Sequence, residues 1–503
     1  MIEQIDLKVE NGDRFEGDCV VYFVPKEEEN EEPYGNVPEF NQELPREFEG
    51  ERDSTAVVES GEFEADRLLL YGCGDPEDLT IQQATEIAGG VHNELDDRKI
   101  KSAAVVYPLW WNIEREASAR ELVTGLKLAS YEFDHYQNDE DAEEDQDEEV
   151  ELESMVIYLG DARSKSTVSD GISEGNKLSD AVGFSRDLAN EPSNELTPAR
   201  LAERAEEEFS DTGVSVEVWD EEDLIEDGMN LIRGVGQGSE QPSRLIRMDY
   251  EPDSPKGYTV LAGKGVTFDS GGISIKPSEK MDEMKFDMCG SATVLGVMKA
   301  VSLLNLPVRV TGFVPSAENM PGQNAIKPGD IISGYYDKSV EIKNTDAEGR
   351  LLLADTLGYI SENLADDLDV LVDYATLTGA CITALGHEAA GLMGNDDDLC
   401  EELMDAGEET DERVWQLPLM EEHTEQMDSE VADVKNLGGK AGAITAGAFL
   451  REFVDEDDIE HWAHLDVAGT GWGMKSLSYR PEGGTGFGVR LTVEFLKQHW
   501  SLS

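Results

Sequence analysis

Three charged side chains stand close together near the middle of this 503-residue chain. In the segment Asn344-Thr-Asp-Ala-Glu-Gly-Arg-Leu351, the charges fall on the alternate residues Asp346, Glu348 and Arg350. On an extended or looped backbone alternate side chains point to one side, so two carboxylates and a guanidinium could share one site. The apolar run that follows predicts a buried helix, and burying charges at its start is costly unless each finds a partner or a metal. Alternatively, the segment is an ordinary acidic first turn, where carboxylates favour the positive end of the helix dipole.

A second group of residues that could do chemistry precedes this segment. The stretch Gly263–Pro277 is rich in glycine, which predicts tight loops, and it carries Lys264, Asp269 and Lys276 among neutral residues. It lacks the GxxxxGK[ST] pattern of a phosphate loop, and Ser270 lacks the GxSxG setting of a serine nucleophile.

The remaining polar residues limit the kind of site. Asp287 stands just before a predicted helix, so it is either a cap of that helix or a site residue. Neither an HExxH motif nor a close Ser/His/Asp set occurs among the seven histidines, so a metal site would rest mainly on carboxylates. The five cysteines have no CxxC spacing, which argues against a disulfide framework or a thiolate zinc site and fits a reducing cytoplasm.

These residues need a scaffold, and the hydrophobic pattern predicts two α/β domains. The length alone favours more than one core. We predict a small N-terminal α/β domain at residues 1–165, a linker helix at 166–194 and a larger catalytic domain at 195–503. In the first domain strands alternate with helices, which favours a mainly parallel sheet. The predicted strands there are Cys19–Val24, Arg67–Tyr71, Ala103–Tyr107 and Met155–Leu159, and the predicted helices are Thr80–Leu95 and Glu116–Phe133.

The second domain is predicted to hold a central mixed sheet flanked by helices. Polar residues follow its strands, as sites in open α/β sheets require. The predicted strands are Val214–Trp219, Leu245–Tyr250, Tyr258–Ala262, Val308–Val314, Val370–Ala375 and His464–Val467. The predicted helices are the linker at Ser169–Ala189 and then Leu201–Phe209, Ala292–Leu304, Glu348–Asn363, Leu399–Ala406, Ala443–Phe453 and Val489–Trp500.

The charge balance limits the partners. The chain has 110 acidic and 40 basic residues and a net charge of −70, so nucleic acid and an anionic membrane surface are disfavoured. We interpret this dispersed charge as adaptation to high salt, which screens the self-repulsion, and expect the source to be a halophile. From Tyr258 to Ala317 the acidic excess disappears, with five acidic and six basic residues.

Two further features concern the acidic run and the targeting of the chain. Eleven of the fifteen residues Asp139–Glu153 are acidic, which predicts a solvated loop; a calcium site is the alternative, but the EF-hand pattern is missing. No signal peptide opens the chain and no apolar run approaches about 20 residues, so we expect a soluble, cytoplasmic protein.

Several segments together resemble the leucyl aminopeptidase family, the hexameric two-metal M17 peptidases. The resemblance covers about residues 185–490, and the NTDAEGRL octapeptide is its most specific part. The matching segments are Asn190–Asn194, Gly263–Pro277, Met284–Met288, Ala317–Pro321, Asn344–Leu351, Thr376–Ala380 and Trp462–Asp466.

The resemblance implies a role for each residue. One metal ion would be held by Lys264, Asp269, Asp287 and Glu348, and a second by Asp269, Asp346 and Glu348, so Asp269 and Glu348 would bridge the two. Lys276 and Arg350 would be the catalytic pair, with bicarbonate bound to Arg350 as the general base. The ions would be manganese or zinc, with cobalt or magnesium as alternatives. The pocket for the N-terminal side chain would be lined by Met284, Thr376, Gly379 and Ala468.

Charge arithmetic agrees with this assignment. Four carboxylates balance two divalent ions if Lys264 binds as a neutral amine, which leaves Lys276 and Arg350 positive beside the oxyanion that forms during attack. A water between two metals roughly 3.5–4 Å apart loses a proton near neutral pH and becomes the nucleophile.

We therefore expect a metal-dependent aminopeptidase that removes leucine-like, apolar residues from peptides, assembled as a homohexamer. The residues after Ala468-Gly469, which are Thr470-Gly471-Trp472, vary within the family, so the exact side-chain preference stays open. Two alternatives remain: another two-metal hydrolase such as a phosphoesterase, and a non-catalytic hexameric scaffold.

Overall fold

The computed structural model describes residues 1–9, 18–26, 48–59, 65–108, 111, 113–137, 152, 154–160, 162–473 and 477–502. They form two compact units: Met1–Gly183 with Lys475–Pro481, and Phe184–Met474 with Glu482–Ser503. The predicted helix Ser169–Ala189 lies inside α3 (Lys165–Asn190). The acidic run Asp139–Glu153 lies outside the described residues except for Leu152 and is still a prediction.

The first unit contains a six-stranded sheet. Its order is β1 (Asp6–Val9), β6 (Ser154–Leu159), β5 (Ser102–Val106), β2 (Cys19–Val24), β4 (Arg67–Gly72) and β3 (Thr55–Glu59). All neighbours are parallel except β3 and β4, so the predicted mainly parallel sheet is confirmed.

Alternation along the strands of this sheet builds two cores. Val21 and Phe23 face the helices α1 (Ile81–Asp97) and α2 (Arg115–Ala129), whereas Val20 and Tyr22 belong to the core on the opposite face.

The second unit is built on a nine-stranded sheet, and the predicted mixed character of this sheet is confirmed. Its order is β16 (Val414–Gln416), β15 (Ala390–Gly394), β18 (Trp462–Asp466), β14 (Val370–Ala375), β9 (Tyr258–Gly263), β11 (Arg309–Asn319), β8 (Arg244–Tyr250) and β7 (Val214–Trp219), with β10 (Gly265–Asp269) paired to β11. The four central strands β18, β14, β9 and β11 are parallel, while β15, β8 and β7 join the sheet antiparallel.

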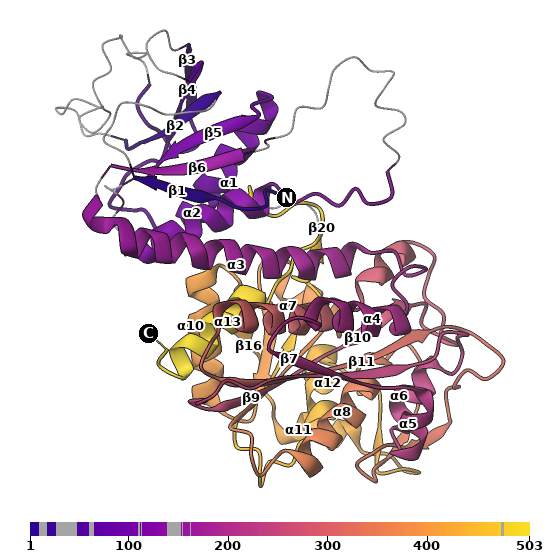
Figure 1. Cartoon of the computed structure of the whole chain (residues 1–503). Coiled ribbons are helices and arrows are strands. Elements are labelled where there is room, and N and C mark those ends of the chain that lie inside the picture. Colours follow the sequence, from indigo (N-terminus) through magenta and orange to yellow (C-terminus); the bar gives the residue numbers. More distant parts are fainter. Residues whose placement is uncertain are drawn as a thin grey trace. The chain divides into compact units, whose positions relative to one another are not determined.

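Helices cover both faces of this sheet, which is why β9 and β14 are buried along their whole length (Figure 1). One face packs against α6 (Asn230–Gly236), α8 (Gly349–Asn363) and α12 (Gly442–Arg451). The other carries α7 (Cys289–Leu304), which contacts α13 (Val489–His499), and α13 in turn contacts α10 (Asp397–Thr410).

Shorter elements complete the second unit. Helix α4 (Pro198–Phe209) begins at Pro198, because the Thr197 hydroxyl accepts a hydrogen bond from the Arg200 amide and Pro198 occupies the first turn. The others are α5 (Glu221–Glu226), α9 (Gly379–Leu385), α11 (Glu421–Thr424), η3 (Met281–Phe286), η4 (Glu425–Met427), β12 (Ile331–Ser333), β13 (Ser339–Glu341), β17 (Val434–Lys435), β19 (Trp472–Gly473) and β20 (Gly483–Gly484).

One strand in this region was not predicted. The glycines of Gly263–Pro277 predict tight loops, but residues Gly265–Asp269 form strand β10, which pairs with the far end of β11. The β-branched and aromatic residues Val266, Thr267 and Phe268 favour this strand, and its pairing partner became visible only in the folded sheet.

Among the described residues, one helical stretch is long and apolar enough to pass for a membrane span. It is Met281–Leu304, and 78% of its apolar window is buried inside the protein, as in the core helix α7 that it contains.

Candidate active site

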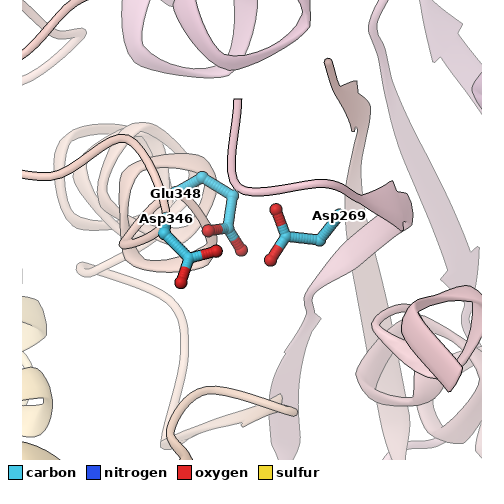
Figure 2. A group of neighbouring side chains, drawn as sticks. All are labelled: Asp269, Asp346 and Glu348. Carbon is cyan, nitrogen blue, oxygen red and sulfur yellow. The ribbon is translucent and has the colours of Figure 1, made fainter. Parts of the chain in front are cut away.

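Three carboxylates converge beyond the ends of the central strands. Asp269 ends β10, while Asp346 and Glu348 lie immediately before α8, and Figure 2 shows all three side chains pointing toward one another. Each offers an oxygen atom, and these atoms lie within 4.8 Å of one another. Asp269 and Glu348 are each 2% exposed, so the carboxylates meet in a largely dehydrated place.

Lys276 lies between two of these carboxylates. Its Nζ atom is 2.6 Å from Asp269 Oδ2 and 2.6 Å from Asp346 Oδ1. Burial opposes its charge, but the surrounding carboxylates, Asp269 foremost, outweigh burial and raise the pKa of Lys276. The loop that carries Lys276 turns back toward the site at Gly271, whose φ of +85° is a conformation that favours glycine.

Lys264 joins the other side of the cluster. Its Nζ atom is 2.7 Å from Asp287 Oδ1, 2.9 Å from Glu348 Oε1 and 3.1 Å from the carbonyl oxygen of Thr376. The side chain passes directly over Gly349, where an added Cβ would come within 2.4 Å of Lys264 Cε. The glycine at this place in the NTDAEGRL segment therefore makes room for the lysine.

The two alternatives, a helix cap at Asp287 and an acidic first turn at Asn344–Leu351, do not describe the contacts. The N-cap position of α7 is Met288, not Asp287, and the first turn of α8 holds no acidic residue, while Glu348 at its N-cap position makes no capping hydrogen bond. Asp287 instead accepts hydrogen bonds from Lys264 and from the Thr376 hydroxyl, the latter at 2.9 Å.

The electrostatics of the cluster follow from burial and these lysines. Burial, reinforced by Glu348, raises the pKa of Asp269 to about 7. Burial also opposes ionisation of Glu348, but Lys264 and Lys276 outweigh it and lower the pKa of that carboxyl to about 2. Burial opposes the charge of Lys264 too, yet Asp287 and Glu348 raise its pKa above the ordinary value.

Two carboxylate oxygens remain without a protein partner. Asp287 Oδ2 and Glu348 Oε2 are buried, and neither has a hydrogen-bond partner among the described residues. Buried carboxylate oxygens are normally satisfied, so such oxygens indicate room for a ligand that accepts lone pairs. The oxygen-rich donor set around them fits divalent metal ions.

Arg350 occupies the first turn of α8 and is 5% exposed. Its Nε atom is buried and has no hydrogen-bond partner in the part of the chain that the structure describes. Burial lowers the pKa of Arg350 to about 10, and Glu348 and Asp466 partly offset this effect, so the guanidinium is charged at neutral pH. A buried, charged fork with unused donors is suited to an anion.

The structure brings three of the four predicted pocket residues into connected segments. Thr376 contacts the cluster directly, and it follows β14 on the same loop as Gly379, where an added Cβ would meet nothing within 4 Å. Ala468 follows β18 and is tied to that loop through Asp466. Met284 is half-buried in η3, three residues before Asp287, and its place in the pocket is still a prediction.

Sequence reasoning gave no role to two asparagines that hold the site together. Asn319 is 2% exposed, and its side-chain amide donates to Asp269 Oδ1 at 2.7 Å and to the Thr345 carbonyl at 3.0 Å. Asn436 is fully buried and bonds the loop before α8 through both ends of its amide. Asn319 lies in a segment quoted for the resemblance, but nothing in the single sequence marks Asn436.

The histidines lie outside the carboxylate cluster. His464 is fully buried in β18, and its Nδ1 lies 2.5 Å from Asp373 Oδ1 on the neighbouring strand β14. None of the seven contributes to the carboxylate group of Figure 2.

Comparison with known proteins gives two family matches. Residues 183–493 match the model of the cytosol aminopeptidase family, catalytic domain, and residues 45–140 match the model of the N-terminal domain of the same family.

Individual relatives agree with the family models. The chain is 43% identical over 462 residues to a "Probable cytosol aminopeptidase" of Geotalea uraniireducens, with 90% of each chain covered. It is 43% identical over 440 residues to a protein of the same name from Azotobacter vinelandii, with 86% of this chain and 85% of the relative covered. Among solved structures, the bottromycin maturation enzyme BotP in complex with Mn superposes with a TM-score of 0.84 at 30% identity, covering 96% of this chain and all of BotP.

Proposed function

This chain belongs to the cytosol aminopeptidase family and is an aminopeptidase, and from that premise we propose that it removes leucine-like, apolar residues from the N-termini of peptides with two divalent metal ions. One observation carries the proposal. Four carboxylates and Lys264 lie close together, and two of the carboxylate oxygens, Asp287 Oδ2 and Glu348 Oε2, are buried without a hydrogen-bond partner among the described residues.

The donor set divides into two groups that share members. Lys264, Asp269, Asp287 and Glu348 would hold one ion, and Asp269, Asp346 and Glu348 would hold the other. When bound, the ions would supply a water-derived nucleophile near neutral pH and polarise the scissile carbonyl. Manganese or zinc fits this role, with cobalt or magnesium as alternatives, and the manganese in the similar BotP structure supports the first.

The remaining work falls to Lys276 and Arg350. The pKa of Lys276 is raised, so its side chain is a charged ammonium at neutral pH. It lies against Asp269 and Asp346, where it can stabilise the negative oxygen that develops on the attacked carbonyl. Donors of this kind contribute about 2.7–4 kcal/mol. Arg350, with unused donors, would bind a bicarbonate ion as the general base.

The substrate end of the site is the loop Thr376–Gly379 together with Ala468 and Met284. Gly379 is exposed and leaves room beside it for a substrate. Leucine-like specificity is proposed from the family resemblance.

We extend the proposal to the assembly and its surroundings. The molecule would be a homohexamer in the cytoplasm of a halophile, acting on peptides without binding nucleic acid or membranes. The net charge of −70 supports the last two statements and the preference for high salt. Light scattering of the purified protein in high salt tests the hexamer, and a tight gel-shift complex with DNA at physiological salt would contradict the charge argument.

The decisive experiment is metal removal and restoration. The protein is stripped with a chelator in high salt, and release of p-nitroaniline from leucine p-nitroanilide is measured after adding Zn²⁺, Mn²⁺, Co²⁺ or Mg²⁺. We expect activity to vanish on stripping, to return with at least one of these ions and to be absent in Asp346→Ala. We also expect the stripped protein to melt at a lower temperature, because its clustered carboxylates lose their counter-charge.

Two controls make this experiment specific. Asp330→Ala removes a carboxylate that pairs only locally with Lys327, so it should retain full activity. Hydrolysis of p-nitrophenyl phosphate without anilide turnover would favour the phosphoesterase alternative. Turnover by Asp346→Ala equal to that of the wild type would overturn the site assignment, and wild-type protein inactive with every ion would support a scaffold.

A further inference from the structure

We propose that Asp466 is a positioning residue that joins the two predicted walls of the substrate pocket and thereby sets which N-terminal side chains the enzyme accepts. This inference rests on the proposed aminopeptidase function. Asp466 is the last residue of β18 and is fully buried, two residues before the predicted pocket residue Ala468.

The carboxylate of Asp466 bonds both walls at once. Its Oδ1 atom accepts hydrogen bonds from the amides of Leu377 at 3.1 Å and Thr378 at 3.3 Å, in the loop that carries Thr376 and Gly379. The same oxygen accepts from the amide of Ala468 at 3.2 Å. Both walls are therefore held to a single atom.

The second oxygen extends this hold to a helix. Oδ2 accepts from the Thr378 hydroxyl at 2.6 Å, and the same hydroxyl caps α9 by accepting from the Cys381 amide at 3.1 Å. Gly379 is the first residue of α9, so its place in the pocket follows from this cap.

The wall that Asp466 holds also contacts the proposed metal ligands. Thr376, next to Leu377, donates to Asp287 from its hydroxyl and accepts from Lys264 at its carbonyl. Thr376 is thus fixed by the cluster, whereas Leu377, Thr378 and Ala468 depend on Asp466. Loss of Asp466 should therefore loosen the pocket more than the metal cluster.

A contrasting carboxylate lies on the neighbouring strand β14, in register with His464, two residues before Asp466. Asp373 also lies in a central strand of the sheet, but its oxygens bond His464 and Trp462 inside the sheet. Asp466 differs because all four of its donors lie beyond the strand ends, in the segments predicted to touch substrate.

The test is a specificity profile. Kinetic constants for leucine, methionine, alanine and glycine p-nitroanilides are measured for the wild type, Asp466→Asn, Asp466→Ala and Thr378→Val. We expect the ratio of kcat/KM for leucine over glycine to fall at least about tenfold in the Asp466 variants, mostly through KM for leucine, since one methylene in a well-formed pocket is worth 10–200-fold. Bound metal, measured by elemental analysis, should equal that of the wild type.

Thr378 provides the second line of evidence. Thr378→Val removes the bond to Oδ2 and the α9 cap and should lower the same ratio, whereas Thr378→Ser keeps the hydroxyl and should restore it. If Asp466→Ala does not fold, the comparison of Thr378→Val with Thr378→Ser still tests the role of the Asp466 contact.

Asp355→Asn is the matched control. Asp355 is likewise fully buried and accepts three backbone N–H bonds, from Leu231, Ile232 and Tyr335, none of which belongs to the pocket. It should keep the wild-type leucine-to-glycine ratio whatever its stability. An unchanged ratio in Asp466→Asn and Thr378→Val, with active wild type, would overturn the inference alone; a wild type without anilide turnover would instead overturn the proposed function.

Discussion

Arg350 is a charge held out of water without a protein partner at its Nε atom among the described residues. If a bicarbonate ion uses these donors as the general base, Arg350→Met should lower kcat by about 10²–10⁴-fold and abolish any stimulation by added bicarbonate. Arg350→Lys keeps the charge but loses the planar fork, so its kcat should lie between those of the wild type and Arg350→Met. The measurement is kcat as a function of bicarbonate concentration in carbonate-depleted buffer. If bicarbonate stimulated Arg350→Met as much as the wild type, the assignment of a bicarbonate site to Arg350 would be wrong.

Asp355 gives a prediction about pH. Burial raises its pKa from the usual 3.8 to about 7, against the three backbone donors that lower it. Between these values the folded state binds more protons than the unfolded chain, so the contribution of Asp355 to stability is full below about pH 4 and is lost as the pH rises through about 7, by up to about 1.4 kcal/mol per pH unit.

Asparagine does not titrate, so comparison of Asp355→Asn with the wild type isolates this effect. The melting temperature of the wild type minus that of the variant should decrease from pH 5 to about pH 7 and level off above it, in one high-salt buffer. Because both proteins share every other carboxylate, a difference that is constant with pH would contradict the assignment.

At the scale of elements, the loop before α8 depends on a residue from a distant segment. Asn436 accepts from the amides of Lys343 at 2.8 Å and Asn344 at 3.3 Å, and donates to the carbonyls of Asn344 at 2.7 Å and Ala347 at 3.1 Å. Asn436→Ala removes all four hydrogen bonds and leaves the buried carbonyl of Ala347 unsatisfied, a loss that costs about 1–3 kcal/mol.

We expect Asn436→Ala to lower the melting temperature and to weaken metal affinity about 10–100-fold, as loss of the groups that orient ligands typically does. Competition with a fluorescent chelator measures the affinity. Asn363→Ala is the control, because the Asn363 side chain also donates two hydrogen bonds, to the Tyr335 hydroxyl and the Tyr359 carbonyl, but is exposed. Both readouts should stay near those of the wild type. An unchanged affinity in Asn436→Ala would show that the loop holds its shape alone.

At the scale of the whole molecule, a net charge of −70 opposes the compact state. The Debye length falls from about 10 Å at 0.1 M to about 3 Å at 1 M salt, so screening should stabilise the fold. We expect the melting temperature to rise by more than about 10 °C between 0.1 M and 3 M KCl. Sucrose at equal osmolality separates screening from general exclusion of solute, and equal melting temperatures at both salt concentrations would exclude the high-salt adaptation.

Much of the architecture was predictable because it depends on local patterns. The strands Val214–Trp219 and Val370–Ala375 were predicted with the bounds that β7 and β14 have, since apolar runs between polar breaks mark buried strands. The strand Gly265–Asp269 was missed because its glycine-rich surroundings resemble a loop and its stability comes from pairing with β11, a partner that is distant in the sequence.

The sequence by itself determined the residue types of the site and, through the resemblance, the family, because the octapeptide and the other matching segments are specific sequence motifs. Only the tertiary structure decided which side chains meet. Lys264, Asp269, Asp287 and Glu348 come from three separate segments that the folded sheet brings together beyond the ends of its central strands. Asn436 and Asp466 acquired their roles in the same way, because a hydrogen bond depends on distance in space, and the chain brings these partners together only when the nine strands are paired.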